Sequence, residues 1–189
     1  MSEKQLIKLC QKNDRKAFEL LVHQYSPVLM GICMRYMKDE APAKDALQEC
    51  FITIFRNIQK YKAIGSFEGW LKRIAVTSSL KELRKKNKNL SSLTMIYEDQ
   101  LEEMSEQPVA IQNMEAKDVL DKINELPEEY RIIFNMYIIE GLSYAEIAEL
   151  LDMKEASCRM RLSRARKKMH SILLKDQDYY GFEQSRKVD

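Results

Sequence analysis

A cluster of arginines and lysines near the C-terminus is the most distinctive chemical feature of this sequence. Seven basic residues and a single acid lie between Glu155 and Lys175, in a chain whose formal net charge is only +2. Arginine binds guanine through paired hydrogen bonds or neutralises a phosphate, so basic residues on one helix point to nucleic acid. A solvated basic helix end, stabilised by the helix dipole, is the simpler alternative.

The spacing of apolar residues predicts the helix that carries these charges. At about 100° per residue, one narrow stripe is formed by Cys158, Leu162, Ala165 and Met169. The basic residues occupy the faces that remain free once this stripe is packed.

A shorter helix is expected just before the basic helix, from about Ser143 to Leu151. Ser143 and Glu146 have the spacing of a capping box, Gly141 can end the preceding helix in a left-handed conformation, and residues 152–154 form a short turn. Two such helices predict a helix-turn-helix whose second helix enters the DNA major groove. Several phosphate contacts would make this binding strongly salt-dependent.

Composition predicts an all-α protein. Only five Gly and four Pro accompany 32% charged residues, a balance typical of helical proteins. The four cysteines are widely spaced and there are only two histidines, so neither a metal site nor a disulfide framework is expected. The sequence has no signal peptide and no apolar run of the ~20 residues that span a bilayer, which predicts a reducing cytoplasm and no direct membrane insertion.

Charge and periodicity divide the chain into basic, acidic and basic blocks. Helical spacing runs from Glu3 to about Lys88, with breaks expected near residues 13–14, 26–27, 41–42 and 65–66, and ends in the basic KELRKKNK. Residues 89–116 contain six acids and no Arg or Lys, and period and charge together suggest a linker over 89–114. Helical periodicity returns at Glu115 and lasts to about Leu174.

One helix of the N-terminal block combines a packing face with a polar face. Leu47, Phe51, Ile54 and Ile58 repeat on the packing side. Asp45, Gln48 and Glu49 lie together on the other side, at spacings of three and four residues. Periodicity alone does not distinguish this polar face from an ordinary solvated surface.

The sequence resembles the extracytoplasmic-function (ECF) sigma factors of the sigma-70 family of bacterial RNA polymerase. The matching segments, in chain order, are YSPVLMGICMRYMKD, DALQECF, SFEGWLKRIA followed by KELRKK, LPEEYRIIFNMYIIEGLSYAEIAELL and CRMRLSRARKKM. The resemblance implies two small helical domains joined by the acidic linker. These are a sigma region 2 bundle over residues 1–88 and a sigma region 4 helix-turn-helix over 115–175, with a tail at 176–189.

The resemblance also implies roles for individual residues. It assigns contact with core RNA polymerase to Asp45, Gln48 and Glu49. Recognition and melting of the minus-ten element falls to Tyr61, Phe67, Trp70, Lys72, Arg73, Thr77, Lys81, Arg84 and Lys85, where rings trap unstacked bases and cations hold the strand. Reading of the minus-thirty-five element falls to Ser157, Arg159, Met160, Arg161, Arg164 and Arg166. Trp70 has an alternative role as a core residue.

Two positions depart from the family pattern, which usually has Asn and then Asp four residues later. This chain has Thr77 and Lys81 there, which puts the preferred minus-ten bases in doubt. In the linker, five acids are candidates to mimic a phosphate backbone inside the polymerase: Glu98, Asp99, Glu102, Glu103 and Glu106.

The expected function is that of a non-enzymatic initiation subunit that binds core RNA polymerase and promoter DNA and helps to open the duplex. The resemblance also implies an anti-sigma factor as a partner, and no cofactor or small-molecule substrate is expected. The alternative is a helix-turn-helix regulator that acts without joining a holoenzyme. The sequence lacks a Gly-rich phosphate loop, a metal-ligand cluster and a nucleophile with a base, so an enzyme is disfavoured.

Overall fold

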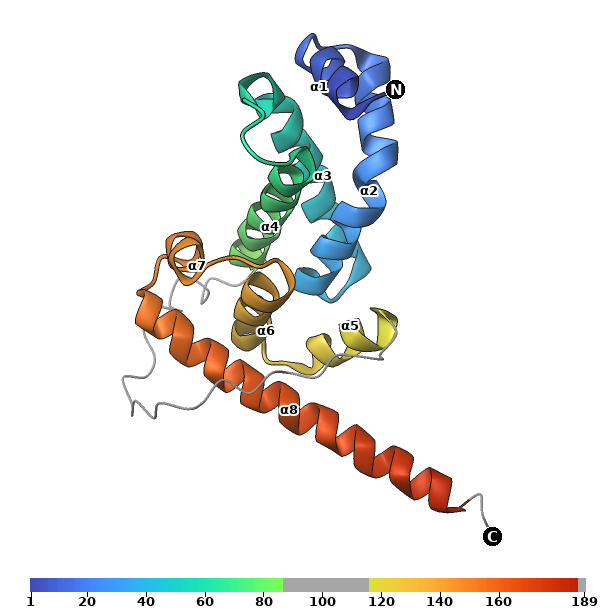
Figure 1. Cartoon of the computed structure of the whole chain (residues 1–189), viewed down its shortest axis with the longest axis vertical. Helices are drawn as coiled ribbons and strands as arrows, with labels where there is room; N and C mark the ends of the chain where they lie inside the picture. Colours follow the sequence, from blue (N-terminus) through green and yellow to red (C-terminus); the bar gives the residue numbers. More distant parts are fainter. Residues whose placement is uncertain (87–115, 187–189) are drawn as a thin grey trace. The chain divides into compact units, whose positions relative to one another are not determined.

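The computed structural model describes residues 1–86 and 116–186, with side chains for 1–85 and 118–175. The predicted all-α fold is confirmed, because every regular element in these ranges is helical (Figure 1). The chain divides into two compact units, Met1–Ser91 and Ser92–Asp189. The five linker acids that were considered as phosphate mimics lie outside the described residues.

The first unit consists of four α-helices and one 3₁₀ turn. They are α1 (Glu3–Gln11), α2 (Arg15–Met37), α3 (Glu40–Asn57), the 3₁₀ turn η1 (Ile58–Lys60) and α4 (Phe67–Lys86). The three long helices α2, α3 and α4 pack against one another, and α1 lies against α2 and η1. Their shared core is formed by fully buried side chains such as Leu21, Leu29, Ile32, Tyr36, Ile54 and Leu71.

Several helix boundaries of this unit follow the predicted capping chemistry. The Asp14 carboxylate accepts a hydrogen bond from the Ala17 amide at 2.9 Å and starts α2. The Ser66 hydroxyl accepts one from the Gly69 amide at 3.0 Å at the start of α4. Both side chains satisfy amides that a first helical turn leaves without an intrahelical partner. Pro42 lies in the first turn of α3, where its missing amide hydrogen costs little.

The predicted helix break at Ser26-Pro27 is wrong, because α2 runs through Pro27 without ending. Proline cannot donate to the carbonyl four residues earlier, and this disfavours an interior position. Pro27 itself is exposed, whereas Tyr25 and Leu29 on either side of it are buried. Continuous burial along α2 therefore outweighs the missing hydrogen bond.

The predicted packing face of α3 is only partly observed. Phe51, Ile54 and Ile58 are buried as expected, but Leu47 is only half-buried. Small side chains occupy the adjacent core positions instead, namely Ala43, Ala46 and Cys50. Small residues bring α3 closer to its neighbours, which a pattern of large apolar residues does not reveal.

The second unit consists of α5 (Ala116–Glu125), α6 (Glu128–Phe134), the π-helical turn η3 (Asn135–Ile139), α7 (Tyr144–Leu151) and α8 (Glu155–Arg186). Helices α5, α6 and α7 each pack against α8. Fully buried residues from every one of these elements form the core: Ile123, Leu126, Ile133, Phe134, Met136, Ile147 and Leu162. Helix α8 continues to Arg186, beyond the region in which helical periodicity was visible in the sequence.

The predicted helix-turn-helix is confirmed in its details. The Ser143 hydroxyl accepts from the Glu146 amide at 3.3 Å, and the Ser143 amide donates back to the Glu146 carboxylate at 3.0 Å. Gly141 has a φ of +70°, and Asp152 ends α7 in the left-handed region with a φ of +52°. The four residues of the predicted apolar stripe on α8 are all at most 1% exposed. Local sequence chemistry therefore fixes both the turn and the packed face of the second helix.

No helix in the described residues combines the length and the apolar composition needed to cross a bilayer.

Candidate nucleic-acid interface

The arginines of α8 lie on two flanks of its buried stripe. Arg159 and Arg166 are seven positions apart, which places them within about 20° of each other around the helix. Arg161 and Arg164 lie on the other flank, roughly 140–160° around the helix from Arg159. Ser157 falls near the second pair, and Met160 lies between the flanks opposite the stripe. The residues predicted to read the minus-thirty-five element therefore do not share one face.

The flank with Arg159 and Arg166 faces two aromatic rings. The guanidinium carbon of Arg159 lies 5.2 Å from the centroid of Tyr144, and that of Arg166 lies 5.6 Å from the centroid of Tyr137. Arg159 also pairs with Glu155 at 3.3 Å, one turn earlier in α8. Cations within about 6 Å of a ring centroid are attracted to the ring face. Neither tyrosine was singled out in the sequence, because their spacing to the arginines carries no periodic signal.

Three aromatic residues of the first unit gather between η1 and α4. The ring centroids of Tyr61 and Trp70 are 5.0 Å apart, and each lies within 5.7 Å of Phe67. Phe67 is 1% exposed and also contacts Tyr25 edge-on, so it is a core residue that supports the other two rings. Tyr61 and Trp70 are half-buried. Burial thus removes Phe67 from the set expected to contact bases directly.

Gln11 of α1, which no sequence pattern identified, supports the backbone next to this aromatic cluster. The side-chain amide of Gln11 donates to the carbonyls of Ile58 and Tyr61 at 3.2 and 3.1 Å. The Tyr61 hydroxyl in turn donates to the carbonyl of Gly65 at 3.3 Å. Ala63 and Gly65 both have positive φ, of 55° and 80°, which closes the loop into α4. No sequence signal identifies Gln11, because its partners are backbone atoms 47 and 50 residues away.

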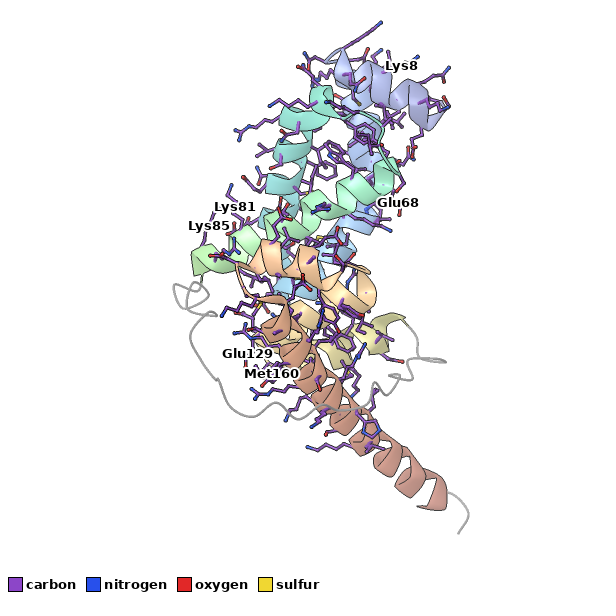
Figure 2. All side chains as sticks on the ribbon, turned by 60° about the vertical axis from the view of Figure 1, so that its left-hand side comes forward. Lys8, Glu68, Lys81, Lys85, Glu129 and Met160 are labelled. Carbon is purple, nitrogen blue, oxygen red and sulfur yellow. The ribbon has the colours of Figure 1, made fainter. Side chains whose placement is uncertain are left out.

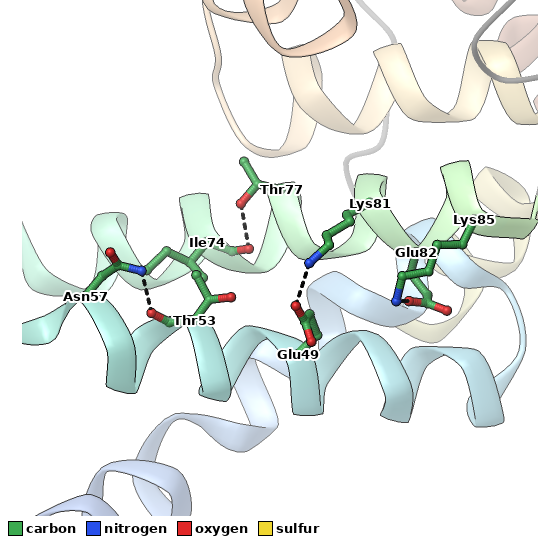
Figure 3. Close-up of polar contacts among 8 residues, drawn as sticks. All are labelled: Glu49, Thr53, Asn57, Ile74, Thr77, Lys81, Glu82 and Lys85. Atoms are coloured by element: carbon green, nitrogen blue, oxygen red, sulfur yellow. Dashed lines mark hydrogen bonds and ion pairs between the residues drawn. The ribbon is translucent and has the colours of Figure 1, made fainter.

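The lysines predicted to hold the melted strand are each paired with a carboxylate. Lys72 lies 2.7 Å from Glu68, and Lys85 lies 2.8 Å from Glu82. Lys81 reaches Glu49 of α3 at 2.6 Å (Figure 3). Arg73 and Arg84 are exposed on the same helix. These three lysines must therefore leave an ion pair within the protein before they can bind a phosphate.

The two departures from the family pattern have separate structural consequences. The Thr77 hydroxyl lies 2.9 Å from the carbonyl of Ile74 and 3.1 Å from that of Arg73, so its hydrogen is held by the helix itself (Figure 3). Lys81 instead extends away from α4 to Glu49. The hydroxyl hydrogen of Thr77 is therefore taken up within α4, whereas Lys81 links two helices.

The proposed polymerase-facing residues of α3 differ in exposure. Asp45 and Gln48 are exposed, whereas Glu49 is half-buried. The hydrogen bond from Lys81, followed by its charge, holds the pKa of Glu49 below its usual value. The hydrogen bond and charge of Glu82 raise the pKa of Lys85, with smaller contributions from Glu49 and Asp45. The acids of α3 and the lysines of α4 thus form one electrostatic surface.

The described residues contain no group of three His, Cys, Asp or Glu side chains arranged to hold a metal ion. The chemistry of both units is that of binding: a helix-turn-helix with a basic second helix in one, and rings, lysines and acids side by side in the other. These features define a DNA-binding protein of the helix-turn-helix class.

Comparison with known proteins identifies the family. Residues 21–89 match the model of sigma-70 region 2, and residues 116–169 match that of sigma-70 region 4. The chain is 30% identical over 176 residues to the ECF RNA polymerase sigma-E factor of Haemophilus influenzae, covering 88% of this chain and 92% of the relative. It is 29% identical over 182 residues to the RNA polymerase sigma-H factor of Pseudomonas aeruginosa, covering 90% and 93%.

A solved structure shares the fold. It contains the sigma factor RpoE in complex with the anti-sigma factor NepR from Bartonella quintana, with a TM-score of 0.54 and 18% identity over 84% of this chain and 97% of that one. The chain therefore belongs to the ECF sigma factors of the sigma-70 family. It is an alternative sigma factor for transcription initiation, and the regulator that acts outside a holoenzyme is not favoured.

Proposed function

We propose that the two units divide the work of promoter recognition, with residues 1–88 as the region 2 domain and 115–175 as the region 4 domain. The first binds core RNA polymerase and melts the minus-ten element, and the second positions the complex at the minus-thirty-five element. Residues 89–114 connect them, and 176–189 form a tail. The observation that carries this proposal is the complete helix-turn-helix in one unit, with Arg161 and Arg164 on the flank of α8 away from the tyrosines.

In the second unit, base reading is assigned to two parts of α8: the flank with Arg161 and Arg164, and the outer face with Met160. Arg161 and Arg164 can donate two hydrogen bonds to guanine, and Met160 offers an apolar contact to a thymine methyl group. Ser157, near the start of the helix, is within the part that enters a major groove in this motif. Arg159 and Arg166 contribute positive charge from the flank of α8 that faces Tyr144 and Tyr137.

In the first unit, strand capture is assigned to Tyr61 and Trp70, whose rings are half-buried and partly open to a base. Phe67 supports them from the core. Thr77 contributes to base preference, and the cationic residues along α4 hold the separated strand: Lys72, Arg73, Lys81, Arg84 and Lys85. Phosphate contacts by these side chains release counterions from DNA.

Polymerase binding is assigned to Asp45, Gln48 and Glu49. The exposed Asp45 carboxylate and Gln48 amide, with the half-buried Glu49 beside them, complement basic and polar groups of a partner. Because RNA synthesis belongs to that partner, the chain itself is non-enzymatic, needs no cofactor, and works in the cytoplasm where its polymerase and DNA reside. An anti-sigma factor is a further partner, by analogy with the complex formed by the structural neighbour.

Reconstituted transcription tests the proposal. The full chain is mixed with sigma-free core polymerase and a promoter library, and promoter-specific runoff RNA is sequenced. We expect RNA only when both chain and core are present. Tight DNA binding by the chain alone, without core binding or runoff RNA, would overturn the proposal in favour of a free-standing regulator.

A further inference from the structure

Four side chains of the second unit form a continuous stack, two tyrosine rings with an arginine over each, which we call the arginine–tyrosine stack. The rings of Tyr137 and Tyr144 are stacked at 4.6 Å with an interplanar angle of 28°. Arg159 lies over Tyr144, and Arg166 lies over Tyr137. The stack therefore joins three elements: η3, the start of α7 and the basic helix α8.

The backbone around the stack fixes where the two rings lie. Tyr144 is the first residue of α7, directly after the Ser143 cap and its two hydrogen bonds with Glu146. Tyr137 is the central residue of the π-helical turn η3, closed by a hydrogen bond from the Glu140 amide to the Asn135 carbonyl at 2.9 Å. Such turns are rare and concentrate at functional sites. Both rings are thus set by elements that do not depend on DNA.

A ring beneath an arginine constrains it without removing its charge. The guanidinium is planar, so a face placed against a ring leaves its N–H donors at the edge, where they can reach a phosphate. Arg159 exchanges its 3.3 Å contact with Glu155 for that phosphate. Arg159 keeps 63% of its side-chain surface exposed in this arrangement. Restricting a flexible side chain in advance lowers the entropy lost on binding.

The position of the stack selects phosphate rather than base edges as its ligand. A helix in a major groove turns one face to the bases and its flanks to the sugar-phosphate backbones. Arg159 and Arg166 lie on the flank that also contacts η3 and α7, away from Arg161 and Arg164. The next elements on that side are the cap of α7 and the π-helical turn, which hold the arginines at the helix edge.

We propose that Tyr137 and Tyr144 are positioning residues that hold Arg159 and Arg166 for contact with the DNA backbone beside the minus-thirty-five element. This inference rests on the proposed function of the second unit. It reassigns Arg159 and Arg166 from base reading to phosphate binding, and it gives roles to two tyrosines that no sequence motif identified. The stack contributes affinity that is nearly independent of sequence, while the opposite flank discriminates between promoters.

The test measures promoter binding by the reconstituted holoenzyme at several salt concentrations. Each lost phosphate contact lowers the slope of log K against log salt by about 0.9. We expect Arg159→Gln and Arg166→Gln each to lower the slope by roughly this amount and affinity several-fold, with the order of preferred minus-thirty-five sequences unchanged. Tyr144→Leu and Tyr137→Leu should reproduce part of the loss, whereas Tyr144→Phe and Tyr137→Phe, which keep the rings, should restore it.

A double-mutant cycle separates positioning from a structural effect. If Tyr144 acts through Arg159, Tyr144→Leu adds little once Arg159→Gln is present, whereas a folding defect would add in full. Lys8→Gln, which removes an exposed positive charge from α1, is the charge-matched control and should leave the slope unchanged (Figure 2). Should a leucine variant fail to fold, the two glutamine variants still decide whether the arginines bind phosphate.

The inference is overturned if the leucine or glutamine variants leave the salt slope unchanged, or if they alter the preferred minus-thirty-five sequence. It is also overturned if the phenylalanine variants are as defective as the leucine variants, because the hydroxyl and not the ring would then matter. Failure of the proposed function looks different, because the wild-type chain would then form no holoenzyme with promoter affinity at all.

Discussion

Three lysines of α4 and two arginines of α8 are restrained by different sets of partners. Lys72, Lys81 and Lys85 each pair with a carboxylate, whereas Arg166 and Arg159 lie over tyrosine rings, Arg159 with an additional acid. A carboxylate cancels the charge that attracts DNA, but a ring leaves it in place. In the proposed DNA-bound state the lysines of α4 must exchange a carboxylate for a phosphate, whereas Arg159 and Arg166 keep a ring partner that leaves their charge in place.

The largest effect is expected on the flank of α8 that faces away from the tyrosines. Arg161→Ala and Arg164→Ala should each weaken use of the minus-thirty-five element about 10-fold or more, because a bidentate base contact contributes about 1–3 kcal/mol of discrimination. Transcription from promoters with and without an intact upstream element measures this. Core binding, followed by native gel shift, should be unchanged, and an equal loss of core binding would show that these arginines are structural.

The second prediction concerns the ion pair between Glu49 and Lys81, where the proposed polymerase-binding and DNA-binding residues meet. Glu49→Gln should weaken core binding about fivefold, since a partly exposed carboxylate is lost from the proposed contact. Lys81→Gln should leave core binding equal or slightly stronger and weaken strand capture, because Glu49 is freed and a cation is lost. Fluorescence anisotropy with labelled core and permanganate footprinting of open complexes distinguish the two effects.

A charge exchange provides the decisive control for this pair. Glu49→Lys combined with Lys81→Glu restores an ion pair between α3 and α4 but reverses the charge offered to each partner. We expect the double variant to fold normally and to remain defective in core binding. Recovery of core binding in the double variant would mean that the pair serves only to join the two helices.

A smaller effect is expected from Glu82, the partner of Lys85. Glu82→Gln removes the hydrogen bond and charge that raise the pKa of Lys85, and the freed lysine can neutralise a phosphate. Affinity for a single-stranded minus-ten oligonucleotide should rise about twofold, with a salt slope steeper by up to about 0.7.

The matched control is Glu40→Gln, which breaks the 2.7 Å pair with Lys44 on α3, outside the proposed DNA-binding set. It should change neither affinity nor slope. A fall in affinity for Glu82→Gln would contradict the idea that carboxylates restrain the lysines of α4.

Local patterns in the sequence were sufficient for the helix-turn-helix but not for the contacts between helices. The Ser143 cap, Gly141, the turn and the stripe through Cys158 are short-range chemistry, and all were predicted. The continuation of α2 through Pro27 was missed because burial on both sides of it is a tertiary effect. Gln11, the Lys81–Glu49 pair and the two tyrosines were missed for a related reason. Their partners lie in other elements, at distances along the sequence that follow no regular helical spacing.

The last prediction contrasts the stability of the two units at alkaline pH. In the first unit, burial raises the pKa of Cys10 to about 11 and of Cys50 to about 12, and it also raises that of Cys33. In the second, burial raises the pKa of Cys158 but lowers that of Arg131 to about 10. Buried thiols favour the neutral form in the fold, whereas an unfolded chain ionises them from about pH 9 upward.

The sign of the effect follows from linkage between proton binding and folding. The stabilisation from each raised thiol is complete below pH 9 and is lost as pH rises toward its folded value, at no more than about 1.4 kcal/mol per thiol per pH unit. The first unit carries three such thiols, Cys10, Cys33 and Cys50, whereas the second carries only Cys158 among the cysteines of the chain. The free energy of unfolding of the first unit should therefore fall more steeply between pH 9 and 11.

Trp70, the single tryptophan of the chain, makes this comparison measurable because its fluorescence reports on the first unit. The free energy of unfolding of the first unit, measured by urea unfolding followed at Trp70, should fall markedly from pH 8 to pH 10. Cys50→Ala should reduce that pH dependence. Cys158→Ala, the matched change in the second unit, should leave the Trp70 transition and its pH dependence unaltered. A Trp70 transition that does not respond to pH over this range would show that ionisation of the thiols is not coupled to unfolding of the first unit.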